Sequence, residues 1–491
     1  MINSSKIFEK YTSEECFKSI INYGTVVRLW SHSVSAYGSN IAIVDGQNYT
    51  YDDVESLVAS YRTVLLDAGL AKGDRIGICL PNGIDFAKAV LAASTLGICS
   101  LLIPPQLSDA AVAGCCLKYQ LKALVSGRNP DNPKPSCPVI SEKASSDIKT
   151  GPDLSITGKT PCVIMFTGGT TGKSKGALLT HEAVVLGTRN GCYGLKNFLE
   201  ERYFLMLPMT HVFGFIRNFM TALMTGSSVW ICHNNKDMFK EMLTFRPTVL
   251  VLVPAIVEMA LNLSRQFGRN MFGDSVKYII CGAATVNPYL VKECGRIGIS
   301  LFPGYGLTES ANLVSGNPDS NVCPGSVGYI YPDIDYKVVD GELWLKGPSI
   351  TEGYCSEPEE NSTAFEDGWF KTGDLVTFDS ENRLYITGRR KEIIVLPTGE
   401  NISPAQLEAR FNELECIQDS LVYEKNGRLV LEVVPRKAAI PAGVNPAAYI
   451  REGFAGVNMN LPAGQKISEI VIRTTDFARS PSMKILRNQP K

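Results

Sequence analysis

Apolar and polar positions alternate along the first part of the chain with two periods, one typical of strands and one typical of helices. The segment "AIVDGQNYTY" (42–51) alternates around Asp45-Gly46, a dipeptide that favours a hairpin turn. The next segment, "DDVESLVASYRTVLLDAGL" (52–70), opens with acids and carries apolar residues at helical spacing. A strand at 75–81, a helix at 85–97 and a strand at 99–105 follow. This order predicts an α/β domain with a largely parallel sheet.

The same pattern resumes after a polar stretch at 126–160, which predicts a loop-rich connection between subdomains. We expect a helix at 181–192 and a series of strands at 162–166, 203–208, 227–232, 248–254, 276–282 and 300–306. Beyond residue 325 short β segments separated by turns replace this pattern. The residues from 389 onward indicate a smaller α+β unit.

Composition limits what the chain can bind. Lys and Arg total 48 and Asp and Glu total 49, so no overall field favours nucleic acid or an anionic membrane. The longest uncharged run, Ala89–Ser108, contains Pro104 and Pro105, which would break a spanning helix. We therefore expect no transmembrane segment and interpret this run as the end of a buried helix followed by a buried strand. Charges scattered through residues 1–30 predict that no signal peptide is present.

Cysteine and histidine usage bears on metals and on location. The 14 cysteines show no C-x-x-C spacing, and there are only 4 histidines, so no zinc ligand set can be assembled. A large chain without a signal peptide predicts reduced thiols and a cytoplasmic location.

The glycine-rich segment "FTGGTTGKSKG" (166–176) is the clearest candidate for phosphate binding. A Walker loop that ended at Gly172-Lys173-Ser174 would need a glycine at position 167, where the chain has Thr167. This spacing excludes a P-loop NTPase. Backbone N–H groups, threonine hydroxyls and lysines can still bind phosphate oxygens, although such a loop could also be a surface turn.

Five further motifs accompany this loop. In order, the set is "FTGGTTGKSKGALLTH" (166–181), "LPMTHVFGF" (207–215), "PGYGLTES" (303–310), "WFKTGDL" (369–375), "YITGRRKEI" (385–393) and "SMKILR" (482–487). Together they resemble the adenylate-forming (AMP-binding) superfamily, which includes the acyl-CoA synthetases, and the resemblance covers nearly the whole chain. It implies an α/β fold with a large N-terminal domain (1–388) of layered α/β subdomains plus a β-rich part. A small mobile α+β C-terminal domain (389–491) would follow.

The resemblance also implies the reaction and its cofactors. A carboxylate would attack the α-phosphate of ATP, releasing pyrophosphate and leaving an acyl-adenylate, and a thiol would then take the acyl group. ATP, Mg²⁺ and CoA, or the phosphopantetheine of a carrier protein, are the implied cofactors. The residues implied to bind ATP or AMP are Thr167, Gly168, Gly169, Thr170, Thr171, Gly172, Lys173, Lys175, Gly282, Ala283, Gly304, Tyr305, Gly306, Asp374 and Arg389.

Specific roles follow from the same resemblance. Thr308 would contact the α-phosphate, and Glu309 would bind Mg²⁺ with Thr170 as its companion. Lys391 occupies the hinge position between the two domains. Lys484 matches the catalytic lysine, although Met483 replaces the glycine that usually precedes it and "RSPS" replaces the usual P-x-T pattern.

His211 lies where related enzymes carry a gating residue beside the substrate carboxylate. The segment "MTHVFGFIRN" has no acidic residue, which argues against an amino-acid substrate, and Val212, Phe213 and Phe215 indicate an apolar wall. We therefore expect a fatty or other apolar acid and transfer to CoA. Two alternatives stay open: an adenylation enzyme that loads an acyl or peptidyl carrier protein, and a non-catalytic nucleotide-binding member of the family.

Overall fold

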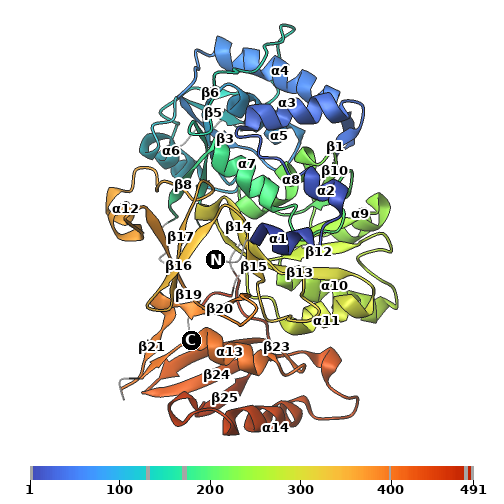
Figure 1. The fold of residues 1–491 in the computed structure, drawn as a ribbon, viewed down its shortest axis with the longest axis vertical. Helices are drawn as coiled ribbons and strands as arrows, with labels where there is room; N and C mark the ends of the chain where they lie inside the picture. The colour runs from blue at the N-terminus through green and yellow to red at the C-terminus, as the bar shows by residue number, and fades with distance from the viewer. Residues whose placement is uncertain (1–3, 129–132, 168–173, 398–399, 480–484, 488–491) are drawn as a thin grey trace.

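The computed structural model describes residues 4–128, 133–167, 174–397, 400–479 and 485–487. Two helix-covered sheets form the larger part of the molecule, a β-rich part adjoins them, and a small unit at the C-terminal end lies below (Figure 1). This arrangement confirms the predicted fold class. The proposed boundary between residues 388 and 389 remains a prediction.

The first sheet contains six strands in the order β6-β5-β3-β4-β7-β8. The predicted strand–helix–strand unit is confirmed as β3 (Arg75–Cys79), α5 (Ile84–Thr95) and β4 (Cys99–Leu102), with β3 and β4 parallel. Helix α5 and strand β4 are buried along almost their whole length, so the uncharged run lies in the core up to Ile103. The remaining strands are β5 (Ala123–Ser126), β6 (Val139–Ile140), β7 (Pro161–Phe166) and β8 (Gly176–Thr180).

The second sheet contains nine strands in the order β15-β14-β13-β12-β11-β9-β10-β1-β2. The six central strands, β13, β12, β11, β9, β10 and β1, are parallel to one another. At one edge β2 is antiparallel to β1, and at the other edge β14 is antiparallel to both β13 and β15. The predicted hairpin is confirmed, and Gly46 adopts the positive φ of 69° that its tight turn requires. The strands are β1 (Ile41–Asp45), β2 (Gln47–Thr50), β9 (Arg202–Leu205), β10 (Ser228–Ile231), β11 (Val249–Leu252), β12 (Tyr278–Cys281), β13 (Ser300–Leu307), β14 (Asn312–Gly316) and β15 (Tyr329–Ile330).

Helices cover the faces of both sheets (Figure 1). Local signals set their starts: the Thr50 and Asp53 side chains form a capping box at α4, and Thr180 caps α7 by accepting from the N–H of Ala183. The helices predicted at 52–70 and 181–192 are thus confirmed with slightly shorter bounds. These helices are α1 (Ser4–Glu9), α2 (Glu14–Lys18), α3 (Val26–Tyr37), α4 (Tyr51–Asp67), α6 (Asp109–Lys118), α7 (His181–Asn190), π-helix η1 (Phe213–Met220), α8 (Thr221–Met224), α9 (Met238–Phe245), α10 (Pro254–Phe267) and α11 (Pro288–Arg296).

The β-rich part is an antiparallel sheet in which the long strand β19 pairs with β17, β18 and β20. The register of β19 and β20 places Asp374 directly opposite Arg389. Its elements are β16 (Asp335–Val339), β17 (Glu342–Lys346), α12 (Pro358–Ala364), β18 (Phe365–Glu366), β19 (Trp369–Phe378) and β20 (Leu384–Arg389), preceded by the 3₁₀ turn η2 (Thr308–Ser310).

The C-terminal unit has its own core, in which α13 packs against the sheet β23-β24-β25 and buries Leu407, Phe411 and Leu431. A short hairpin, β21 (Ile394–Val395) and β22 (Asn401–Ile402), precedes it. The other elements are η3 (Arg390–Glu392), α13 (Pro404–Asn412), β23 (Ile417–Lys425), β24 (Arg428–Pro435), η4 (Lys437–Ala439), α14 (Pro446–Met459), η5 (Ala463–Gln465) and β25 (Glu469–Ile472).

Two further features bear on the sequence predictions. Within the described ranges, no helix has both the length and the apolar character that crossing a membrane requires. The 14 cysteines are all free thiols.

The imidazole of His181 is enclosed at the start of α7. Its side chain is fully buried, and Nδ1 accepts a hydrogen bond from the backbone N–H of Val26 at 3.3 Å. Burial lowers the pKa of His181 from 6.5 to about 4. As the pH falls, the unfolded chain therefore binds a proton on this residue before the folded protein does. We expect a loss of stability between about pH 6.5 and 4, worth about 3 kcal/mol from this residue.

The variant His181→Asn isolates this effect, because its amide oxygen can accept from Val26 without titrating. Denaturant unfolding at pH 7 and pH 4.5 should show that the wild-type protein loses about 2 to 3 kcal/mol more than the variant. Carboxylates titrate in both proteins and cancel in this comparison. Equal losses would mean that His181 is not the responsible group.

Candidate active site

The carboxyl ends of β12 and β13 form the centre of the candidate site. A Cβ atom on Gly282 would lie 3.2 Å from the carbonyl oxygen of Gly304, and one on Gly306 would clash with the carbonyl oxygen of Asn312. Ala283 adopts a φ of 64°, a left-handed conformation that is costly for alanine and is often retained at ligand sites. Ligands of parallel sheets bind outside the carboxyl ends of the strands, where these residues lie.

A buried carboxylate joins β13 to the β-rich part. Asp374 is 2% exposed; its Oδ2 accepts a hydrogen bond from the Tyr305 hydroxyl at 2.6 Å, and its Oδ1 lies 2.8 Å from Nε of Arg389. The structure therefore brings together three predicted nucleotide-binding residues from two sheets.

The electrostatics of this cluster fix its protonation. Burial, and then the Asp374 carboxylate, raise the pKa of Tyr305 well above its usual value, so the phenol remains a donor. Burial disfavours the positive charge on Arg389 and by itself would lower its pKa. The negative charge of Asp374, with a smaller contribution from Glu309, outweighs burial, and the pKa of Arg389 is raised. An ionised carboxylate can accept up to four hydrogen bonds, and Tyr305 and Arg389 both lie within hydrogen-bond distance of Asp374.

A second cluster lies at the base of the glycine-rich loop. The N–H of Thr167, which is buried, donates to the carbonyl oxygen of Lys175 at 2.8 Å, closing the hairpin of β7 and β8. Nζ of Lys175 pairs with Glu360 and lies 5.1 Å from the centre of the Tyr354 ring. The Tyr354 hydroxyl in turn donates to Oε1 of Glu309 at 2.6 Å. Tyr354 thus connects the loop base to the predicted magnesium ligand.

Other predicted residues surround these clusters. Thr308 and Glu309 lie in the 3₁₀ turn that directly follows β13, and Thr308 is half-buried. Lys391 is exposed in η3, and its charge assists Lys175 in lowering the pKa of Glu360. Outside the described residues lie the predicted loop residues Gly168, Gly169, Thr170, Thr171, Gly172 and Lys173, and the predicted catalytic Lys484.

The donor set fits magnesium bound together with phosphates. No group of three or more His, Cys, Asp or Glu side chains among the described residues could hold a metal ion. Glu309 is 9% exposed, and among the described residues its Oε1 accepts from the Tyr354 hydroxyl while no bond to its Oε2 is found. Mg²⁺ commonly takes one or two carboxylates and completes its shell with substrate phosphates and water.

The segment after His211 forms the π-helix η1, a rare conformation that is frequent at functional sites. His211 is half-buried, and its carbonyl oxygen accepts from the N–H of Phe215 at 2.8 Å. The Phe213 ring lies beside Gly282, since a Cβ there would be 3.3 Å from Phe213 Cζ. Phe215 packs against Phe86 in the core. Phe213 is thus the part of the predicted apolar wall that the structure places at the end of β12.

Sequence reasoning missed two residues of this region. Tyr354 lies in "TEGYC", a segment without a recognisable signal. Arg217, also on η1, is 2% exposed, and its signal was a lone charge within the apolar run "VFGFIRNFM".

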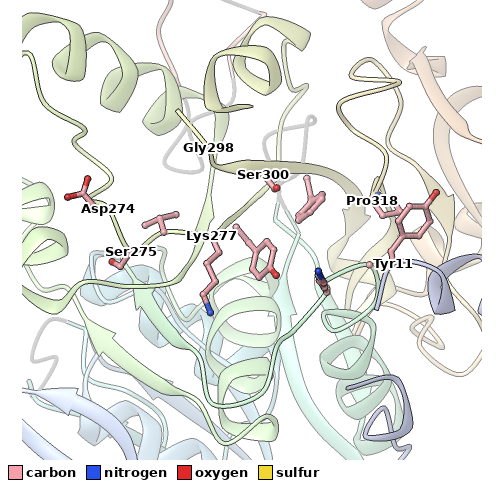
Figure 2. Close-up of a pocket in the computed structure, with 12 residues that line it drawn as sticks. Tyr11, Asp274, Ser275, Lys277, Gly298, Ser300 and Pro318 are labelled. Atoms are coloured by element: carbon pink, nitrogen blue, oxygen red, sulfur yellow. The ribbon is translucent and has the colours of Figure 1, made fainter. Parts of the chain in front are cut away.

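A cavity of about 590 Å³ lies elsewhere in the molecule (Figure 2). It is an open groove at the opposite, amino ends of β12 and β13, where Lys277 and Ser300 line it (Figure 2). None of the predicted site residues borders it.

The chain is similar to known proteins over most of its length. The model of the family described as AMP-binding enzyme matches residues 30–355. The medium-chain fatty-acid–CoA ligase of Escherichia coli is 26% identical over 80% of this chain and 77% of its own length. The long-chain fatty-acid–CoA ligase of Yersinia pestis is 25% identical over 95% and 94%. The structure of O-succinylbenzoate coenzyme A synthetase from Bacillus subtilis, in complex with ATP and magnesium, superposes with a TM-score of 0.78 at 22% identity, covering 94% of this chain and 98% of that one.

Proposed function

The chain belongs to the AMP-binding enzyme family, and on this premise we propose that it is an ATP-dependent, AMP-forming acid–CoA ligase. ATP, Mg²⁺ and CoA are its cofactors, and a small carboxylic acid is its substrate. The observation that carries the proposal is the cluster of the buried Asp374 with Tyr305 and Arg389, together with the Glu309–Tyr354–Lys175 cluster. One cluster fits a ribose and the other fits metal-bound phosphates.

In the first half-reaction, a carboxylate oxygen of the acid bonds to the α-phosphorus of ATP, and the bond from that phosphorus to the bridging oxygen breaks. Both reactants are anionic, so the site must neutralise charge. Bound Mg²⁺ supplies charge neutralisation on the phosphates. Lys175 and the loop that it closes would hold the β- and γ-phosphates, Thr308 would donate to the α-phosphate, and Asp374 would hold the ribose.

In the second half-reaction, the CoA sulfur bonds to the acyl carbon, the bond from that carbon to AMP breaks, and the thiol proton leaves to solvent. Lys484 would contact the acid and the α-phosphate in the first step, and His211 would lie beside the acid. Residues 1–388 and 389–491 would be the two domains, with Lys391 as their hinge. The free thiols support the proposed cytoplasmic location.

The class of carboxylic acid that the enzyme activates is a further part of the proposal. Phe213 beside Gly282 supports an acid with an apolar body, and fatty acids are the substrates named for the two curated relatives above. Loading of an acyl carrier protein has no comparable support, and neither does non-catalytic nucleotide binding.

Acid-dependent exchange of labelled pyrophosphate into ATP tests the first half-reaction, and thioester formation with CoA tests the second. We expect both to require Mg²⁺ and the same acid. Absence of exchange with every acid in a broad panel would refute the proposed function. Thioester formed only on a phosphopantetheinylated carrier protein would move the acceptor from CoA to that partner.

A further inference from the structure

Arg217 carries a buried positive charge without a counter-charge. The residue is 2% exposed on η1, and neither Nε nor Nη1 has a hydrogen-bond partner within the described structure. No salt bridge to it occurs among the described residues. Burying an unpaired guanidinium is strongly unfavourable, so such a group normally meets an anion in the functional complex.

The ionisable groups around Arg217 do not supply that anion. The positive charge of Arg217 favours ionisation of three nearby side chains, Tyr203, Tyr331 and Cys192. Burial raises the pKa of Tyr203 and of Cys192 to about 12 and raises that of Tyr331 as well. All three side chains are therefore neutral at physiological pH. The charge of Arg217 partly offsets this rise in the pKa of Tyr203, but a neutral phenol supplies no counter-charge.

Arg217 lines a small cavity directly behind the nucleotide-binding strand. The cavity has a volume of about 20 Å³, and Pro303, Gly304 and Leu313 are among its walls. Gly304 also contacts the end of β12, where the Phe213 ring lies. Arg217 thus lies on the same helix as Phe213, four residues further along the chain. A cavity of this size holds about one water molecule, so it has no room for a long hydrocarbon tail.

We propose that Arg217 binds a second carboxylate of the substrate, and that the acid activated by this enzyme is a short dicarboxylic acid. This inference rests on the proposed function above. One carboxylate would react at the α-phosphate, the apolar middle of the acid would contact Phe213, and the remote carboxylate would pair with the guanidinium. A planar carboxylate can accept two parallel N–H bonds from arginine, which is the pairing that Arg217 lacks.

The same pairing would exclude simple fatty acids of equal length. A monocarboxylic acid would place an apolar end against Arg217 and leave the guanidinium both desolvated and unpaired. Sites built to hydrogen-bond a substrate group reject analogues without that group far more strongly than apolar pockets distinguish chain lengths. We therefore expect a discrimination of roughly 10²-fold or more in kcat/KM.

The test compares matched acids in the exchange and thioester assays. Straight-chain dicarboxylic acids from malonate to suberate are each paired with the analogue that carries an isopropyl group in place of the second carboxylate. With the wild-type enzyme, the best dicarboxylic acid should exceed its analogue roughly 10²-fold. Arg217→Met should reverse this preference, because methionine fills a similar volume without charge. Arg217→Lys should retain part of it, and the control Arg265→Met, on the exposed side of α10, should leave it unchanged.

The outcomes separate this inference from the proposed function. If the wild-type enzyme activates monocarboxylic acids as well as dicarboxylic acids, the inference fails and the proposed function stands. If it activates no acid, both fail. The open groove of Figure 2 shares Gly194, Phe302 and Pro318 with the Arg217 cavity. A dicarboxylate that binds without being activated would therefore indicate an anion entering from that groove and would overturn the proposal. If Arg217→Met does not fold, the wild-type comparison and Arg217→Lys decide.

Discussion

Replacement of Asp374 with alanine is expected to lower kcat/KM for ATP by roughly 10²- to 10³-fold. The variant loses a carboxylate that is 2% exposed and leaves the Arg389 guanidinium and the Tyr305 hydroxyl without their partner. Ribose hydroxyls would lose a charged acceptor at the same time. Because the acid does not contact this residue in the proposed mechanism, KM for the acid should change much less than KM for ATP.

Two companion variants make this prediction specific. Asp374→Asn keeps the shape and one acceptor oxygen, so we expect a smaller loss, roughly 10-fold. Asp379→Asn is the matched control: Asp379 lies in the same hairpin and pairs with Arg383 at 2.8 Å, but it is partly exposed at the turn. Its effect should stay within about 2-fold. Pyrophosphate release gives kcat/KM, and the melting temperature shows whether each variant folds. Wild-type kcat/KM for ATP in Asp374→Ala would remove this residue from the nucleotide site.

The Asp374 cluster also shows how far the sequence could be interpreted. The motifs "KTGDL" and "GRRKE" identified Asp374 and Arg389 one by one, because these short segments keep a recognisable spacing. Their pairing depends on the register of β19 and β20, and on a loop that brings β13 beside them. Local patterns do not encode such contacts. Tyr354 was missed for the same reason, since its contact with Glu309 spans 45 residues.

For single helices, the differences between prediction and structure come from features of the chain close to each helix. Helix α4 was predicted over 52–70 and is observed over Tyr51–Asp67, because Thr50 caps its start and Gly69 takes a positive φ of 77° just beyond its end. The π-helix η1 could not be distinguished from an α-helix or a buried strand by an apolar run of its length. The sequence shows Arg217 as a single charge in that apolar run, but a binding role could be inferred only from the structure, in which the side chain is buried and its Nε and Nη1 have no hydrogen-bond partner among the described residues.

A second large effect is expected where the C-terminal unit meets α10 and α11. Arg436, directly after β24, is 1% exposed, and its Nε and Nη2 lie 2.9 and 3.1 Å from the two carboxylate oxygens of Glu258 on α10. Its guanidinium carbon also lies 4.0 Å from the centre of the Tyr289 ring on α11. This buried ion pair joins residues on opposite sides of the proposed hinge at Lys391.

Arg436→Met should weaken this docking by roughly 10²- to 10³-fold, because Glu258 would remain buried without a counter-charge. Distances between spin labels on α10 and α14 should lengthen, and trypsin should cleave faster at the exposed Lys391. The double variant Glu258→Met/Arg436→Met removes both charges and should recover most of the docking. Arg473→Met, the control, breaks a pair with Glu432 that lies wholly within the C-terminal sheet and should change neither measurement.

The two half-reactions then show what the pair does for catalysis. If rotation about Lys391 separates adenylate formation from thioester formation, the docked arrangement serves one of these steps and opposes the other. Loss of the Glu258–Arg436 pair should therefore slow one half-reaction roughly 10-fold or more while leaving the other unchanged or faster. Single-turnover rates with ATP and acid, and then with the isolated adenylate and CoA, measure the two steps separately. Equal slowing of both steps would mean that the pair only stabilises the protein, and unchanged label distances in Arg436→Met would mean that it does not set the arrangement at all.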